Sequence, residues 1–197
     1  SRPESGYART ARIGERGGPV QEAREEFAGE QAEAAAGVYR PWDQETPYDL
    51  AYRSPSFFTA ESYLLNDDGK LMRIGIPEDA DLQGVMNGQM IVELNSDWTP
   101  ADTTYSQGSV ISIDFARFME GARDFDVLFA PSGTVAIKRG GVVSTRDYVI
   151  LNLLDNVVGR MMRFSYIDGE WRGEDIEAEA LGSINLVTAA EDSNVFF

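Results

Sequence analysis

Short apolar runs separated by turn residues recur along this chain, and this repetition restricts what it can fold into. The clearest stretch extends from Glu61 to Phe129. Within it, Gly108 to Asp114 alternates apolar and polar residues, as in a strand with one buried face. No apolar run approaches the roughly 18 residues that a membrane-spanning helix needs, so no membrane partner is expected. The pattern predicts an all-β protein of short antiparallel strands.

Two Asp-Gly pairs predict tight hairpin turns between neighbouring strands. Asp68-Gly69 separates Glu61–Leu65 from Lys70–Ile76, and Asp168-Gly169 precedes Glu170. Glycine supplies the positive φ that such turns require. The carboxylates of the first turn could instead begin a calcium loop, with Glu78 as the twelfth residue counted from Asp67. Apolar or basic residues stand where that loop needs ligands, at Leu71, Arg73 and Gly75, so a turn is the preferred interpretation.

Other local signals predict further elements. A short helical turn is expected at Ala116–Gly121, with Asp114 as its cap and Gly121 at its end. Arg40–Pro47 is interpreted as a loop and Ser54–Ser56 as a turn. The remaining predicted strands are Tyr7–Ile13, Glu25–Ala28, Glu33–Arg40, Tyr48–Arg53, Gln89–Leu94, Phe125–Phe129, Tyr148–Leu154, Arg160–Tyr166, Gly182–Val187 and Val195–Phe197.

The strands fall into groups that recur about every 45–55 residues, close to the length of a four-stranded propeller blade. We therefore predict a single domain, 1–197, that is a partial β-propeller of about four antiparallel blades with one or two short helical turns. The expected blades are 1–29 (partial), 30–77, 78–131, 132–180 and 181–197 (partial). A β-sandwich is the alternative for so many short strands. Because the chain opens at Ser1 and closes inside an apolar run, both ends are expected to be internal to a longer protein.

The composition excludes several kinds of chemistry. The 33 acidic and 17 basic residues give a net charge of −16, which disfavours nucleic acid as a partner. The acidity is interpreted as a solubility feature or as a face that attracts cationic ligands. The chain has no cysteine and no histidine, so it cannot form a disulfide, a histidine-based serine triad or most zinc sites. We accordingly assign no catalytic, cofactor-binding or metal-binding residue and expect no cofactor, and the compartment, cytoplasmic or periplasmic, stays open.

A few residues could belong to a binding or catalytic site. Trp98, beside Asp97, is interpreted as a packing residue between blades, with contact to a peptide as the alternative. Glu45 and Asp49 near Trp42 could form a glycosidase carboxylate pair, but solvated loop acids are the preferred interpretation. Gly140-Gly141 is too short for a phosphate-binding loop. Arg160 and Arg163 are expected to form surface ion pairs.

Scattered segments of the chain resemble the β-propeller of bacterial prolyl oligopeptidase family serine peptidases, over about Gly6 to Phe197. The most specific part is Ser96-Asp-Trp-Thr99 with the Tyr105-Ser-Gln-Gly108 turn and the strand that follows. Further matching segments are Gly6-Tyr-Ala-Arg9, Arg16-Gly-Gly-Pro19, Phe57-Phe-Thr59, Tyr63-Leu-Leu65, Gly69-Lys-Leu71, Pro77-Glu-Asp-Ala80, Val127-Leu-Phe129 and Leu151–Val157 followed by Arg160.

This resemblance implies a noncatalytic propeller that covers the active site of a separate α/β-hydrolase domain and restricts entry to short peptides. The catalytic domain of that family carries its serine in a Gly-x-Ser-x-Gly elbow, and this chain contains neither that motif nor histidine. The implied partners are therefore the absent α/β-hydrolase domain and a short peptide substrate. Two alternatives stay open: a stand-alone binding or scaffold propeller, and a carboxylate-dependent glycoside hydrolase. A partial ring would expose strand edges, so an open arc or association through those edges is expected.

Overall fold

The computed structural model describes residues 10–13, 24–28, 35–66, 68–156 and 158–176, together with positions 19, 21 and 194. The chain divides into two compact units. The first comprises Ser1–Pro41 and Pro47–Asp79, and the second comprises Trp42–Thr46 and Ala80–Phe197. Antiparallel sheets dominate the described residues, which contain one α-helix and no closed propeller. The predicted all-β class is confirmed.

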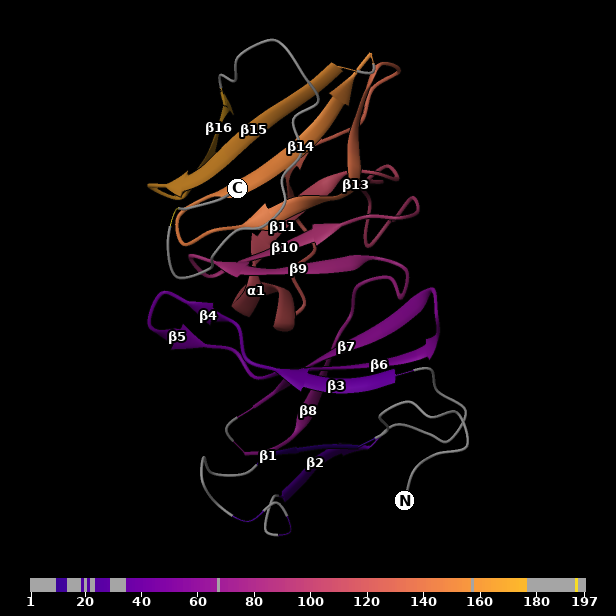
Figure 1. The fold of residues 1–197 in the computed structure, drawn as a ribbon, viewed down its shortest axis with the longest axis vertical. Coiled ribbons are helices and arrows are strands. Elements are labelled where there is room, and N and C mark those ends of the chain that lie inside the picture. The colour runs from indigo at the N-terminus through magenta and orange to yellow at the C-terminus, as the bar shows by residue number, and fades with distance from the viewer. Residues whose placement is uncertain are drawn as a thin grey trace. The chain divides into compact units, whose positions relative to one another are not determined.

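The first unit contains a four-stranded sheet in which consecutive strands pair in the order β3-β6-β7-β8 (Figure 1). Its strands are β3 (Ala35–Tyr39), β6 (Leu50–Ser56), β7 (Thr59–Leu65) and β8 (Leu71–Ile74). A separate antiparallel pair is formed by β1 (Thr10–Ile13) and β2 (Arg24–Ala28). Two short strands, β4 (Trp42–Asp43) and β5 (Thr46–Pro47), lie in sequence between β3 and β6, yet the hairpin residues Trp42–Thr46 belong to the second unit.

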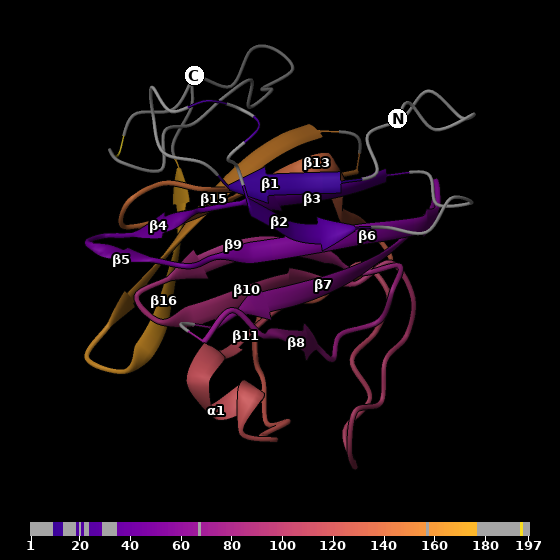
Figure 2. The same ribbon diagram turned by 90° about the horizontal axis from the view of Figure 1, so that it is seen from below.

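The second unit contains two four-stranded sheets with the same simple up-and-down order. The first consists of β9 (Asp81–Met86), β10 (Gln89–Glu93), β11 (Val110–Asp114) and β12 (Asp126–Phe129). The second consists of β13 (Val135–Ser144), β14 (Val149–Asp155), β15 (Val158–Ile167) and β16 (Glu170–Ile176). Figure 2 shows β9, β10 and β11 side by side, with helix α1 (Phe115–Met119) leaving the end of β11.

Turn chemistry explains why the chain reverses where it does. The predicted turn at Gly69 is confirmed, with φ of 73° at the glycine. The predicted turn at Asp168-Gly169 is also confirmed, with φ of 54° and 82° as a two-residue hairpin of this twist requires. Asn87-Gly88 makes the same turn between β9 and β10, with φ of 51° and 74°. Neither that turn nor β9 itself was predicted, although Asn-Gly is a strong hairpin signal.

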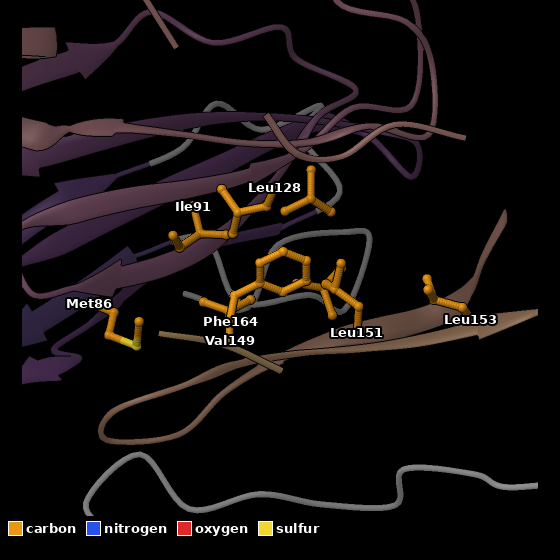
Figure 3. Packing of buried hydrophobic residues seen from close by; sticks show 9 residues of the cluster. Met86, Ile91, Leu128, Val149, Leu151, Leu153 and Phe164 are labelled. Atoms are coloured by element: carbon orange, nitrogen blue, oxygen red, sulfur yellow. The ribbon is translucent and has the colours of Figure 1, made fainter. Parts of the chain in front are cut away.

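The two sheets of the second unit pack face to face and share one apolar core (Figure 3). Strand β9 contacts β13, and strand β12 contacts β16, so first strands lie beside first strands and last beside last. The core residues are Met86, Ile91, Val110 and Leu128 from one sheet and Val142, Val149, Leu151, Leu153 and Phe164 from the other. Each of these two sheets covers one face of the other. The apolar side chains on the two facing surfaces are thereby removed from water.

Burial of β11 corrects one prediction. Its alternation was interpreted as a strand with one solvated face, yet Val110, Ile111, Ser112 and Ile113 are all buried. The hydroxyl of Ser112 lies 3.4 Å from Oε1 of Gln89, which gives the buried polar group a partner. Small polar residues that bond within the sheet can therefore occupy a covered face.

The alanine-rich segment near Glu33 forms strand β3, as predicted, despite the helical propensity of alanine. A Cβ at Gly37 would lie 2.7 Å from the ring of Tyr52 on the paired strand β6, so the glycine makes room for that ring. Ala36 and Ala51 form a small buried cluster with Val38 and Tyr63 against it. Small residues here allow close approach of the paired strands.

Two predicted irregular segments are wrong. The expected loop at Arg40–Pro47 contains the short strands β4 and β5. The expected turn at Ser54–Ser56 is the end of β6, where a register shift between Arg53 and Ser56 accommodates Pro55. The helical turn is confirmed as α1, with the Asp114 carboxylate accepting from the Arg117 N–H at 2.9 Å. The strands predicted at Gly182–Val187 and Val195–Phe197 lie outside the described residues.

Leu151→Ala is expected to lower the free energy of unfolding by about 2–5 kcal/mol, because it opens a cavity where the two sheets meet. Val158→Ala, at a strand position of the same sheet that is 66% exposed, should cost less than about 1 kcal/mol. Urea denaturation of both variants measures the difference. Equal losses would contradict the assigned core.

Candidate functional site

Three turns of the second unit surround an open depression with a volume of about 810 Å³. They are the β4–β5 hairpin, the β9–β10 turn and the β13–β14 turn. The lining residues are Asp43, Gln44, Glu45, Thr46, Asn87, Arg146 and Asp147. We call this feature the turn depression. Three of its residues are acidic and one is basic, so its surface favours a cationic or mixed-charge ligand over an anion.

Asp43 fixes one wall of the turn depression. Its buried carboxylate accepts the Asn87 N–H at 2.7 Å and the Gly88 N–H at 2.6 Å. The Gln44 side-chain amide donates to Oδ1 of Asn87 at 2.5 Å. Amide groups at the tip of a two-residue hairpin have no partner within the strands, so a carboxylate that accepts from both of them is a strong local tie. The β4–β5 hairpin is thereby held on the end of the β9–β10 hairpin.

Asp147 fixes the opposite wall through a reciprocal pair of bonds with Asn194. The Asn194 amide donates to Oδ2 of Asp147 at 2.7 Å, and the Asp147 N–H donates to Oδ1 of Asn194 at 3.1 Å. Arg146 adds an ion pair, with Nη2 at 3.2 Å from the same carboxylate oxygen. The Asn194 hydrogen bond, followed by the Arg146 contacts, lowers the pKa of Asp147, while partial burial opposes this.

The turn depression holds no arrangement that could carry out acyl transfer. The hydroxyl of Thr46 has no imidazole base, because the chain contains no histidine. Asp43 and Asp147 are already bonded to backbone or side-chain partners. Among the described residues, no three His, Cys, Asp or Glu side chains gather as metal ligands would. The geometry suits binding or support of structure.

The described part of the chain contains no helix that is both long and apolar enough to cross a bilayer.

Trp98 packs, as predicted, but within its own sheet. Its backbone pairs with that of Tyr105 across the connection between β10 and β11. Its ring lies edge-on to Phe125 at 5.2 Å between centroids, and Tyr105 contacts the same ring at 5.5 Å. These contacts fasten the Ser96–Gly108 connection to the residue that precedes β12.

The two carboxylates weighed as a glycosidase pair fall in different units. Glu45 is exposed and lines the turn depression. Asp49 belongs to the first unit, where it pairs with Arg40, whose Nη2 lies 2.7 Å from Oδ2. The Asp49 carboxylate is thus engaged by Arg40, while Glu45 lies in the other unit, so these two residues are not shown together as a carboxylate pair.

The predicted ion pairs of Arg160 and Arg163 are confirmed. Nε of Arg160 lies 2.6 Å from Asp175, and Nε of Arg163 lies 2.7 Å from Glu174. The guanidinium of Arg163 also lies over the ring of Tyr148, 5.0 Å from its centroid. Gly140-Gly141 forms part of a bulge in β13 and not a phosphate-binding loop.

No local pattern in the sequence predicts the turn depression as a whole. Asn87-Gly88 carried a local signal for one of its turns. The contact of Asp43 with that turn spans 44 residues of sequence and leaves no local pattern. The residues around Asp43 carry no strand or hairpin signal, because Arg40–Pro47 has the composition of a proline-containing loop.

Two sequence relatives of this chain are named as peptidases. No family model matches the chain. The uncharacterized peptidase y4nA of Sinorhizobium fredii (strain NBRC 101917 / NGR234) is 28% identical over 201 residues, which covers 98% of this chain and 27% of that protein. The uncharacterized peptidase RP174 of Rickettsia prowazekii (strain Madrid E) is 28% identical over 121 residues, covering 58% of this chain and 16% of that protein. The chain thus spans about a quarter, or less, of the length of these relatives.

Two solved structures share the fold. A post-proline cleaving enzyme from Rickettsia typhi superposes with a TM-score of 0.77 and 21% identity over 90% of this chain and 27% of that one. A structure from a study of two prolyl endopeptidases gives a TM-score of 0.58 and 11% identity over 89% of this chain and 24% of that one. The matched part is the propeller domain of these enzymes. The resemblance to the β-propeller segment of prolyl oligopeptidase-type peptidases is confirmed.

Asp43→Ala is expected to lower the free energy of unfolding by about 1–3 kcal/mol, because it leaves the Asn87 and Gly88 N–H groups without their acceptor. The neighbouring Glu45→Ala, at an exposed position, should change it by less than about 0.5 kcal/mol. Urea denaturation gives the free energies, and hydrogen exchange at Asn87 and Gly88 should accelerate only in the Asp43 variant. Unchanged exchange there would refute the tie.

Asn194→Ala is expected to raise the pKa of Asp147 toward its ordinary value, because Asn194 is the main cause of its lowering. In the native chain the folded pKa lies below the unfolded one. The stabilisation from Asp147 is therefore present above the unfolded pKa of about 3.9 and is lost as pH falls through the folded value. Carboxyl carbon NMR during an acid titration measures this. Asp175, whose pKa is lowered by Arg160, is the internal control and should not move.

Proposed function

We propose that this chain is the noncatalytic β-propeller portion of a prolyl oligopeptidase-type serine peptidase, where it gates entry to a separate α/β-hydrolase domain so that only short peptides reach it. One observation carries the proposal: the fold agrees with that of a post-proline cleaving enzyme over 90% of this chain while covering 27% of that enzyme. The peptidase names of the sequence relatives support the same conclusion.

We further propose that the blades are 30–77, 78–131 and 132–180, with partial blades at 1–29 and 181–197. Each of the three central ranges contains one four-stranded sheet, β3-β6-β7-β8, β9 to β12, or β13 to β16. In the second unit the sheets stack with first strands together and last strands together. Radially arranged blades stack in this way, whereas a sandwich has no need of equivalent strands in register.

The catalytic chemistry of the proposed enzyme comes from outside this chain. A serine nucleophile needs an imidazole base and an oxyanion site, and this chain supplies no histidine. The α/β-hydrolase domain is therefore the first proposed partner, and a short peptide is the second. A ring of four-stranded sheets around a narrow channel can admit a short peptide while excluding a chain as long as a whole protein, so the propeller can select substrates by size without reactive residues.

The test begins with the reading frame that encodes the chain, which should continue into a Gly-x-Ser-x-Gly segment and a later histidine. The encoded enzyme should cleave short proline-containing peptides and leave casein intact. The same enzyme without the residues of this chain should gain activity on casein, because the filter is removed. The 197-residue chain alone should cleave neither substrate.

A stop codon soon after Phe197 would refute the proposed peptidase. An intact enzyme that cleaves casein as fast as short peptides would refute the size filter. Size-exclusion chromatography of the truncated enzyme serves as the control that the catalytic domain is folded.

A further inference from the structure

Strand β13 is interrupted by an unusually large bulge. Ile137 pairs with Leu153 and Val142 pairs with Leu151, so the four residues 138–141 stand opposite Asn152 alone. Figure 1 shows the strand bending sharply along its length. Bulges redirect side chains away from the regular sheet and occur often beside functional sites. The side chains that this one redirects are those of Lys138 and Arg139.

Two glycines make the bulge possible. Gly140 has φ of 66°, a conformation that side-chain-bearing residues rarely adopt. A Cβ at Gly141 would lie 2.6 Å from the carbonyl oxygen of Lys138 and 2.7 Å from that of Asn152. Because both atoms belong to the backbone, the sheet would have to shift to accept any side chain there. The sequence Lys138-Arg-Gly-Gly141 therefore specifies this shape.

Arg139 differs from the other arginines whose side chains the structure describes. Eight of them pair with a carboxylate: Arg40, Arg53, Arg73, Arg117, Arg146, Arg160, Arg163 and Arg172. Arg123 bonds to backbone carbonyls and lies over Phe118. Arg139 is exposed and makes no ion pair or hydrogen bond to a described side chain. In a chain of net charge −16, an arginine without a carboxylate partner is unusual.

The bulge also lies on a particular edge. β13 is the first strand of its sheet and contacts β9, the first strand of the neighbouring sheet. In the proposed propeller these first strands are assigned to the edge where the blades converge. In a propeller the converging edges of the blades line the central channel.

We propose that Arg139 binds the carboxylate of a short peptide at the channel edge of its sheet, an inference that rests on the proposed function. A guanidinium can hold a carboxylate through two parallel N–H···O bonds, which a lysine cannot do. Lys138 next to it adds positive potential. Because the rest of the chain is strongly acidic, this cationic bulge gives an anionic peptide end a favourable place to bind.

The experiment uses the ¹⁵N-labelled 197-residue chain and three probes based on acetyl-Ala-Ala-Pro-Ala-Ala. One probe has a free C-terminal carboxylate, one has a C-terminal amide, and one is the amide with glutamate in place of the second alanine. Affinities come from NMR titration, with the Arg139 side-chain Nε–H as the local reporter. Arg139→Gln is the test variant. Arg172→Gln is the matched control, since Arg172 is exposed and 3.9 Å from Asp168.

The free-acid probe should shift the Arg139 signal and bind about three- to tenfold more tightly than the amide, the range for an exposed charge-assisted contact. Arg139→Gln should remove this preference and Arg172→Gln should keep it. Tight binding of the glutamate probe would show that a side-chain carboxylate suffices, and weak binding would assign the site to the chain end.

Equal binding of acid and amide, or a preference that survives in Arg139→Gln, would overturn the assignment of Arg139 and leave the size filter standing. No binding of any probe would overturn it as well. Failure of the size filter would appear separately, in the casein assay of the intact enzyme. Circular dichroism of both variants confirms that the sheets are retained.

Discussion

The face-to-face burial of two sheets is the interaction on which the second unit depends. Strand β14 shows it most clearly, because Val149, Leu151 and Leu153 belong to the shared core and are fully buried. Ile150 and Asn152 alternate with them on the other face of β14 and are buried as well. A strand covered on both faces cannot belong to an isolated sheet. The burial of a few such side chains, each worth about 1.5–3 kcal/mol, outweighs what the surface ion pairs supply. The exposed ion pairs between β15 and β16 therefore contribute less to stability than the apolar contact between the sheets.

Local sequence predicted much of this fold, and apart from the missed Asn87-Gly88 turn and strand β9 the failures described here share one cause. Turns such as Asp168-Gly169 and the cap at Asp114 depend on residues within a few positions of one another, so they could be recognised directly. The hairpin at Trp42–Pro47 and the end of β6 at Pro55 depend on contacts that the flanking sequence does not encode. The half-buried interpretation of β11 failed for the same reason, because alternation cannot show that a second sheet covers the polar face. The turn depression was out of reach, since its central tie joins Asp43 to Asn87.

The fold of this chain and the greater length of its relatives both bear on its function. The fold match covers nearly all of this chain but about a quarter of the matched enzymes, and the reactive groups of a serine peptidase have no counterpart in this sequence. In the described part of the chain, shape and packing explain the residues that the backbone restricts most. The glycines of the β13 bulge illustrate this, because Gly141 is fixed by two backbone oxygens and not by any reaction.

The path of the backbone between the units has a consequence for how this protein could be divided. The chain leaves the first unit after Pro41, gives the Trp42–Thr46 hairpin to the second unit, and returns at Pro47 before crossing again at Asp79. Asp43 fastens that hairpin to the β9–β10 turn. A single cut after Asp79 would remove the Trp42–Thr46 hairpin from the second unit. The two units are thus interlaced along the polypeptide, and no single cut between consecutive residues separates them, although each has its own sheets.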